Sequence, residues 1–202
     1  MKIICIGRNY AEHAAEMKSE IPKAPVFFMK PDTALLKDAD FYFPGFSSDI
    51  HYECELVVKI DRIGKHIAPE FAHKYYSSVS LGIDFTARDL QAACKEKGLP
   101  WEIAKAFDQS AVVASTWIPI TAETFNSLFF EFYQNGTLRQ QGNPSMMLFN
   151  INQIIAYISQ FITLKTGDLI FTGTPAGVGP IAIGDTLIGT LNGEEMYRIS
   201  VK

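Results

Sequence analysis

Residues 129–140 read FFEFYQNGTLRQ, in which residues 129–134 and 137–140 flank Asn135-Gly136. An Asn-Gly pair in such a setting is the strongest short-range indication of a β-hairpin. A second pair, Asn192-Gly193, lies between residues 186–191 and residues 194–201. Because hairpins pair their strands antiparallel, we expect an α+β fold with mostly antiparallel strands and peripheral helices.

The remaining strands are expected where short runs of apolar residues occur. These runs cover residues 2–6, 51–60, 79–83 and 169–171, and residues 26–29 form one more. Strands therefore outnumber helices in the predicted fold.

Three helices are predicted from the residues that start them. Asn9, with an acidic residue three positions later, suits the cap of a helix over residues 10–18. Thr86 suits the cap of a second helix that ends at Gly98, and Asn150 that of a third, with isoleucines at helical spacing after it. No repeat or linker interrupts the pattern, so we expect a single domain over residues 1–202.

The composition excludes several classes of protein. The 202 residues are 48% hydrophobic and 20% charged, as in ordinary soluble globular proteins. A net charge of −4 without a basic run argues against nucleic acid or a membrane surface as partner. The apolar run at residues 1–6 is too short for a signal peptide or a membrane span. Cys5, Cys54 and Cys94 have no Cys-x-x-Cys spacing, which indicates reduced thiols in the cytoplasm.

Glu53 and Glu55 stand out as acidic residues within the otherwise apolar run 51–60. Alternation along a strand puts both carboxylates on one face, where they repel and are costly to bury unless a cation lies between them. Asp84, at the end of the run 79–83, is the candidate third ligand. Such an all-oxygen set suits Mg²⁺ or Mn²⁺ better than zinc. The alternative is that the two glutamates form the solvent-facing side of an edge strand.

Candidate catalytic residues lie on the predicted helices and near them. His13 and Glu16 share one helix face, and a carboxylate beside an imidazole raises its basicity, as a general base acting on water requires. The alternative is a surface ion pair. Lys105 lies among small and apolar residues, where it could stabilise a developing enolate or extend to solvent. Arg88 could bind a substrate carboxylate or pair with a neighbouring acid.

Residues 172–179 read TGTPAGVG, a loop that follows a predicted strand. It lacks the lysine and the following helix of a phosphate-binding P-loop. Two interpretations remain, a backbone that closely approaches an anion and an ordinary turn.

Taken together, these segments resemble the fumarylacetoacetate hydrolase family, and within it the small acylpyruvate hydrolase and oxaloacetate decarboxylase type. The matching segments follow in family order over nearly the whole chain: GRNYAEH (7–13), ECEL (53–56), DFTARDLQ (84–91), GLPW (98–101), TGTP (172–175) and GVG (177–179). The resemblance implies a mixed β-sandwich roll, and usually a homodimer. One departure concerns residues 107–113, which lack the Cys-Pro often found there. The resemblance therefore does not extend to the shape of the pocket at this point, whereas the metal site is unaffected.

The resemblance also implies roles for individual residues. It gives Glu53, Glu55 and Asp84 as ligands of Mg²⁺ or Mn²⁺, His13 and Glu16 as a water-activating dyad on a lid helix, Lys105 as the active-site lysine, and Arg88, Gln91 and Thr174 as substrate-side residues. The substrate would be a small 2-oxo acid.

The expected activity is metal-dependent hydrolysis of the C–C bond of acylpyruvates (2,4-dioxo acids), giving pyruvate and a carboxylic acid, with oxaloacetate decarboxylation at the same site. An enzymatic alternative is isomerisation or tautomerisation of 2-hydroxy-dienoates or oxaloacetate. A different alternative is a metal-stabilised binding protein without turnover. The presence of His13 and Glu16 favours hydrolysis or decarboxylation over isomerisation alone.

Overall fold

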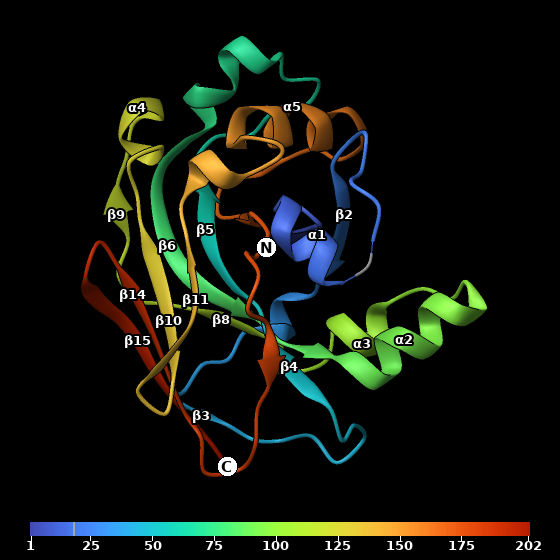
Figure 1. The fold of residues 1–202 in the computed structure, drawn as a ribbon. Helices are drawn as coiled ribbons and strands as arrows, with labels where there is room; N and C mark the ends of the chain where they lie inside the picture. The colour runs from blue at the N-terminus through green and yellow to red at the C-terminus, as the bar shows by residue number, and fades with distance from the viewer. Residues whose placement is uncertain (18) are drawn as a thin grey trace.

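Two β-sheets form the body of the molecule, and short helices surround them (Figure 1). The computed structural model describes residues 1–17 and 19–202. Side chains from both sheets meet in one large hydrophobic core, to which Leu56 and Leu81 contribute from one sheet and Phe130 and Leu187 from the other. This arrangement confirms the predicted α+β fold with mostly antiparallel strands.

The larger sheet has seven strands, of which the central β1, β12, β5 and β6 are largely buried. Its order is β2 (Val26–Lys30), β1 (Ile3–Gly7), β12 (Leu169–Phe171), β5 (Cys54–Ile60), β6 (Tyr76–Asp84) and β8 (Ala111–Val113), and β9 (Ile118–Pro119) also pairs with β6. In β5, Leu56 and Val58 face the main core, whereas Val57 joins a smaller cluster on the opposite side. Because both faces of β5 are covered there, residues 56–58 are consecutive apolar residues rather than an alternating pattern.

The second sheet has five strands and contains both predicted hairpins. Its order is β11 (Thr137–Gly142), β10 (Phe130–Gln134), β14 (Thr186–Leu191), β15 (Glu194–Val201) and β3 (Asp40–Phe41). Asn135 and Gly136 have φ of 52° and 74°, and Asn192 and Gly193 have φ of 53° and 84°. Positive φ at both central residues is the geometry of a type I′ hairpin turn, so the two Asn-Gly predictions are confirmed.

A small third sheet of β13 (Gly179–Pro180), β4 (Ile50–Tyr52) and β7 (Thr86–Ala87) lies beside the larger one. The predicted strand over residues 51–60 is therefore interrupted at Glu53. Its first part pairs with β7 and β13, whereas its second part pairs with β6 and β12. Glu53 lies at the point where the chain changes sheets.

The longest helix is α5 (Ile151–Phe161), which packs on the 3₁₀ segment η2 (Pro69–Tyr75). The side chain of Asn150 accepts from the Gln153 N–H, and the Gln153 side chain accepts in return from the Asn150 N–H, so the predicted cap is confirmed. The other short segments are η1 (Asp32–Ala34), α4 (Ala122–Phe125) and η3 (Pro144–Met146).

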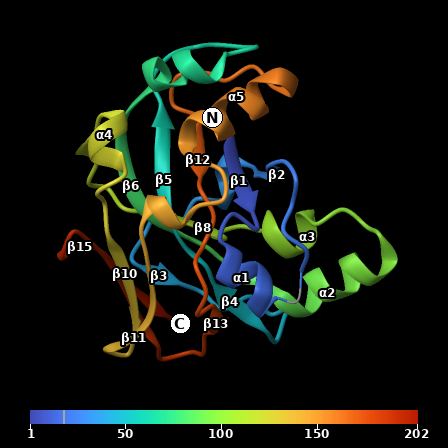
Figure 2. The same ribbon diagram turned by 45° about the horizontal axis from the view of Figure 1, so that its top comes forward.

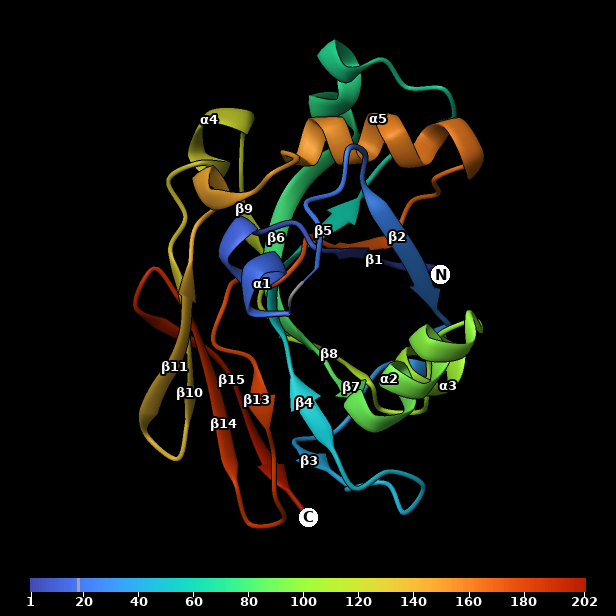
Figure 3. The same cartoon turned by 45° about the vertical axis from the view of Figure 1, so that its right-hand side comes forward.

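Helices α2 (Arg88–Lys97) and α3 (Glu102–Lys105) form an arm that projects from the sheets (Figure 2). Helix α1 (Ala11–Glu16) lies on the other side of the segment where β4 passes into β5, as Figure 3 shows. The prediction placed this helix over residues 10–18, and its position 18 lies outside the described residues. The arm and α1 thus flank the junction that carries Glu53.

Two of the predicted helix caps are wrong. No side chain caps α1, because Asn9 instead hydrogen-bonds the backbone of Phe149 and the carbonyl of Thr172. Thr86 lies in β7, one residue before the cap position Ala87 of α2, and its hydroxyl accepts a hydrogen bond from Lys105. In both cases the polar side chain serves a long-range contact rather than the local helix.

Candidate active site

Three carboxylates converge where β5 and β6 pair. Glu53 precedes β5, Glu55 is its second residue, and Asp84 ends β6. The Asp84 N–H donates to the Glu53 carbonyl at 2.8 Å, and Glu55 lies opposite Gly82 in the sheet register. One oxygen of each carboxylate lies within 4.8 Å of the others, and all three residues are buried. The structure therefore brings the three predicted ligands together and rules out a solvent-facing edge strand.

The loop after β12 fixes the orientation of Glu55. The Gly173 N–H donates to Glu55 Oε2 at 2.7 Å. Gly173 has φ of +98°, and a Cβ there would lie 2.7 Å from the Cβ of Asn9, so a side chain would be strained and crowded. The TGTP segment is thus a backbone that closely approaches an anion, and that anion is a carboxylate of the chain itself.

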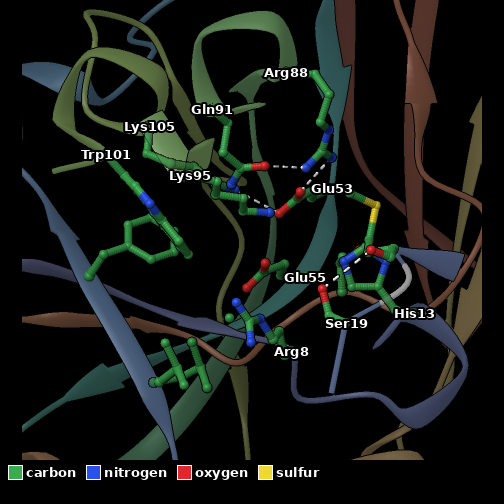
Figure 4. A pocket seen from close by; sticks show the side chains of 16 residues that line it. Arg8, His13, Ser19, Glu53, Glu55, Arg88, Gln91, Lys95, Trp101 and Lys105 are labelled. Carbon is green, nitrogen blue, oxygen red and sulfur yellow. Dashed lines mark hydrogen bonds and ion pairs between the residues drawn. The ribbon is translucent and has the colours of Figure 1, made fainter. Parts of the chain in front are cut away.

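Cationic side chains pair with two of the carboxylates, as Figure 4 shows for Glu53. Lys105 Nζ donates to Glu53 Oε2 at 2.8 Å and to Asp84 Oδ2 at 2.9 Å. The Arg88 guanidinium donates to Glu53 Oε1 at 2.7 Å. Lys105 is 3% exposed, so the alternative that it extends to solvent is wrong. Arg88 pairs with a neighbouring acid, Glu53, which was one of the two interpretations offered for it.

Lys30, at the end of β2, is a residue of this site that the sequence analysis missed. Its ammonium lies 2.7 Å from Asp84 Oδ1 and donates to the carbonyl and hydroxyl of Ser110 at 2.9 and 3.0 Å. It also donates to the carbonyls of Phe85 and Lys105. In the sequence, Lys30 directly follows the apolar run 26–29. A lysine at the end of a strand is usually exposed at the surface, so this position alone does not indicate a buried site residue.

Among the described residues, Glu53 and Asp84 form ion pairs with cationic side chains, and Glu55 forms none. Burial would raise the pKa of Glu53, but Lys105 and Arg88 outweigh it and lower that pKa below its ordinary value. Burial, together with Asp84 and Glu53, raises the pKa of Glu55 well above its ordinary value. The pKa of Lys105 is raised, because Asp84 and Glu53 outweigh the effect of its burial.

These residues fit a hard divalent cation. A buried carboxylate with one backbone donor, next to two further carboxylates, gains most from a positive charge placed among them. The donor atoms are all oxygens, which is the set that Mg²⁺ and Mn²⁺ bind in proteins. Glu53, Glu55 and Asp84 are thus the residues that could hold such an ion.

His13 and Glu16 form a contact on α1. His13 Nδ1 lies 3.1 Å from Glu16 Oε2, and Glu16 Oε1 accepts from the Gly177 N–H at 3.1 Å. His13 is 7% exposed and lines the same cavity as Glu53 and Glu55. With Nδ1 directed to Glu16, Nε2 is the nitrogen available to a reacting group. The pair is therefore more than a surface ion pair.

The predicted substrate-side residues also line this cavity. The Arg88 guanidinium donates to Gln91 Oε1 at 2.8 Å, which holds both side chains on one face of α2. The Thr174 hydroxyl donates to the Cys54 carbonyl at 2.9 Å and accepts from Gln140 at 2.7 Å.

Cys5, Cys54 and Cys94 are free and buried. No helix among the described residues has the length and apolar character needed to cross a bilayer.

A buried acidic triad, a lysine and a histidine–carboxylate pair lie at or beside one cavity of a mixed β fold, an arrangement suited to metal-assisted acid–base chemistry. Comparison with known proteins identifies the family. Residues 2–198 match the family described as fumarylacetoacetate (FAA) hydrolase, C-terminal. The chain belongs to this family of enzymes.

Several relatives cover almost the whole chain. "Oxaloacetate tautomerase FAHD1, mitochondrial" of Mus musculus is 41% identical over 201 residues, which are 99% of this chain and 91% of the relative. "Oxaloacetate tautomerase YcgM" of Escherichia coli (strain K12) is 40% identical, over 96% of this chain and 90% of the relative.

Solved structures agree with this result. A fumarylpyruvate hydrolase from Pseudomonas aeruginosa, in complex with Mn²⁺ and pyruvate, superposes with a TM-score of 0.92 at 34% identity, over 100% of this chain and 89% of the other. The 2-hydroxyhepta-2,4-diene-1,7-dioate isomerase from Mycobacterium marinum has a TM-score of 0.84 at 34% identity, over 99% and 73%. The family thus includes hydrolases, tautomerases and isomerases built on the same fold.

Proposed function

We propose that this chain is a divalent-metal-dependent enzyme of 2-oxo acids that moves a proton at C3, and that its chief reaction is keto–enol tautomerisation of oxaloacetate. Decarboxylation of oxaloacetate would use the same site. The observation that carries the proposal is the convergence of three buried carboxylates with Lys105, at a cavity that Glu53, Glu55 and Lys105 line. The two oxaloacetate tautomerases at 40–41% identity support the choice of substrate.

A divalent cation held by Glu53, Glu55 and Asp84 supplies Lewis-acid stabilisation of negative charge on a substrate oxygen. Lys105 Nζ, which donates to two of these carboxylates, places a second positive charge beside the same region and stabilises the oxygen of an enolate. Water is kept from these groups by their burial, which strengthens both effects.

The substrate is oriented by the arm. Arg88 and Gln91 line the cavity from α2 and are suited to the C1 carboxylate of a 2-oxo acid. Arg88 is itself held by Glu53, so its guanidinium is ordered before the substrate arrives. Thr174 lines the same cavity from the loop after β12.

His13 is the proton carrier in this proposal. In the keto-to-enol direction its Nε2 takes a proton from C3, and the C–H electron pair forms the C2–C3 double bond. The π pair of the C2 carbonyl moves to its oxygen, which then takes a proton from the His13 imidazolium or from water. Glu16 stabilises the imidazolium that forms. In decarboxylation the C3–C4 bond breaks, CO₂ departs, and the electron pair of that bond forms the enolate of pyruvate, whose C3 is protonated afterwards.

Hydrolysis of acylpyruvates, the activity expected from the sequence, is the second candidate. The specific observation in its favour is the contact between His13 and Glu16, since a carboxylate-oriented imidazole can deprotonate water. The hydroxide would attack the distal carbonyl, the C3–C4 bond would break, and its electron pair would form the pyruvate enolate. The two candidates differ in whether His13 acts on water or on carbon.

The test compares oxaloacetate and acetylpyruvate with Mg²⁺, with and without EDTA. We expect the enol of oxaloacetate, followed by its ultraviolet absorbance, to decay faster with the protein than without it, and EDTA to abolish the difference. In His13→Ala the proton transfer should fall roughly 100- to 10,000-fold. Enol decay at the same rate with and without protein would contradict the proposal, and faster turnover of acetylpyruvate would favour hydrolysis.

The homodimer implied by the family resemblance and the cytoplasmic location expected from the cysteines remain predictions. Light scattering on the purified protein tests the first, because a dimer has twice the 22.5 kDa mass of the chain. Microscopy of the tagged full chain in its own cells tests the second.

A further inference from the structure

Two cationic side chains line the active-site cavity without belonging to the machinery described above. Arg8 lies between β1 and α1, and Lys95 lies on α2. Lys95 follows Arg88 by seven residues and Gln91 by four, so the three share one face of the helix, with Lys95 farthest from the start of the helix. Figure 4 shows Arg88, Gln91 and Lys95 on one side of the pocket and Arg8 on another, with Glu55 between.

Neither of these cations forms an ion pair with an acidic side chain among the residues that the structure describes. Within the described part of the chain, ion pairs at the site join carboxylates to Lys30, Arg88 and Lys105, and none involves Arg8 or Lys95. Lys95 lies 5.4 Å from the ring centroid of Trp101, a cation–π contact that positions the ammonium without neutralising it. Burial, with Arg88 and Arg8 nearby, lowers the pKa of Lys95 and outweighs the opposite effect of Glu53.

The backbone of Arg8 is also unusual. Its φ is 58°, in the left-handed region that a residue with a long side chain rarely occupies. Such a conformation is unfavourable and persists when its surroundings hold it, often at ligand sites. Arg8 is followed by Asn9, whose side chain bonds to the loop after β12, so the surrounding contacts hold this turn.

The charge of the whole cavity points to a doubly negative ligand. Glu53, Glu55 and Asp84 are matched in number by Lys30, Arg88 and Lys105. A bound dication would leave an excess of positive charge at the carboxylates, and Arg8 and Lys95 add to it at the wall of the cavity. One substrate carboxylate beside Arg88 leaves these two cations unsatisfied.

We propose that Arg8 and Lys95 bind the second carboxylate of the substrate, so that the enzyme selects dicarboxylic 2-oxo acids over 2-oxo acids with an uncharged tail. This inference rests on the proposed function and specifies its substrate class. Arg8 approaches from the turn before α1 and Lys95 from the arm, so a ligand held by both connects the two sides of the cavity. Uncharged acylpyruvates would lack this contact and would bind through the carboxylate beside Arg88.

The test uses two probes of equal chain length, 2-oxoglutarate and 2-oxopentanoate, which differ in a terminal carboxylate against a methyl group. Their binding to the full chain is measured by titration calorimetry with Mg²⁺. The variants are Arg8→Asn, Lys95→Met and the double variant. Asparagine tolerates the left-handed conformation better than arginine, so Arg8→Asn should fold. Lys97→Met is the matched control, because Lys97 lies on another face of the exposed end of α2.

We expect the wild-type protein to bind 2-oxoglutarate about tenfold or more tightly than 2-oxopentanoate, as one or two charge-assisted hydrogen bonds provide. The double variant should lose this preference while its affinity for 2-oxopentanoate stays within about twofold, and Lys97→Met should behave as wild type. In turnover of oxaloacetate, the double variant should have a higher KM than the wild type, with kcat changed less. Higher salt should weaken the preference.

A preference that survives in the double variant overturns the inference and leaves the proposed function intact, provided the wild type turns over oxaloacetate. Equal loss of affinity for both probes also overturns it, because Arg8 and Lys95 would then act on the cavity in general. A wild-type protein that binds neither probe and turns over no 2-oxo acid with Mg²⁺ overturns the proposed function, and the inference with it.

Discussion

Replacing Lys30 by methionine removes a fully buried ammonium while keeping a side chain of similar length. Lys30 Nζ lies 2.7 Å from Asp84 Oδ1 and also donates to the carbonyl and hydroxyl of Ser110. The Lys30→Met variant therefore leaves Asp84 with one fewer cation and leaves the Ser110 oxygens without this donor. The side chains of Lys30 and Asp84 are 0% and 1% exposed, so water does not replace the ammonium.

The size of the effect follows from these contacts. Removing one partner of a buried ion pair costs roughly 3–5 kcal/mol, because the remaining charge stays buried. Each carbonyl left without its donor adds up to about 1–3 kcal/mol, although such losses are not additive. Lys105 still pairs with Asp84 at 2.9 Å, which limits the total. We expect a loss of about 3–5 kcal/mol, a large part of the roughly 5–15 kcal/mol by which domains are stable.

Urea unfolding followed by circular dichroism, in EDTA, measures this loss. With a slope of about 1–3 kcal/mol per molar urea, the midpoint should fall by more than about 1 M while the slope stays the same. Lys65→Met is the control, since Lys65 is exposed, and its effect should stay within about 0.5 kcal/mol. A midpoint for Lys30→Met that matches the control would refute the reasoning, because the ammonium would then not satisfy Asp84.

Further predictions concern the loop, a buried carboxylate and a helix cap. Gly173→Ala should lower stability by more than about 1 kcal/mol and weaken Mn²⁺ binding, since a Cβ would lie 2.7 Å from that of Asn9; unchanged Mn²⁺ affinity would contradict it. Burial would raise the pKa of Asp168, but its hydrogen bonds from Lys2 outweigh burial and lower that pKa. The ionised Asp168 therefore stabilises the fold above about pH 4, the ordinary pKa of an aspartate, and this stabilisation is lost as the pH falls through the lowered pKa. Asp168→Asn should therefore cost about 1–3 kcal/mol at pH 7 and progressively less below pH 4, and a cost that does not vary with pH would be the wrong result. Asn150→Ala should cost about 1 kcal/mol in thermal unfolding, and no loss would mean that the cap of α5 contributes nothing.

The parts of the fold that local chemistry decides were predictable from the sequence. Asn135-Gly136 and Asn192-Gly193 adopt positive φ with little cost, so each hairpin follows from a few neighbouring residues. Helix α5 likewise follows from a cap and an apolar spacing within one segment. The acidic triad was predictable in kind, because carboxylates within apolar strands require a cation wherever those strands lie.

The parts that depend on distant partners were not predictable. Asn9 bonds to Phe149 and Thr172, which follow it by 140 and 163 residues, and these buried contacts prevail over a local cap. Lys30 finds its acceptors 55 to 80 residues away, so nothing near it in the sequence marks it as buried. The interruption at Glu53 arises because β4 and β5 pair with different strands, which a single apolar run does not reveal.

The central claim is that Glu53, Glu55 and Asp84 together hold one divalent cation. Titration of the metal-free protein with Mn²⁺, followed by the electron paramagnetic resonance of the free ion, tests it without reference to any substrate. The wild-type chain should bind one Mn²⁺, Glu55→Gln and Asp84→Asn should each weaken binding by at least about 10- to 100-fold, and the exposed Glu70→Gln should bind as wild type. Equal Mn²⁺ binding by Glu55→Gln and the wild type, or no bound Mn²⁺ in the wild type, would contradict the claim.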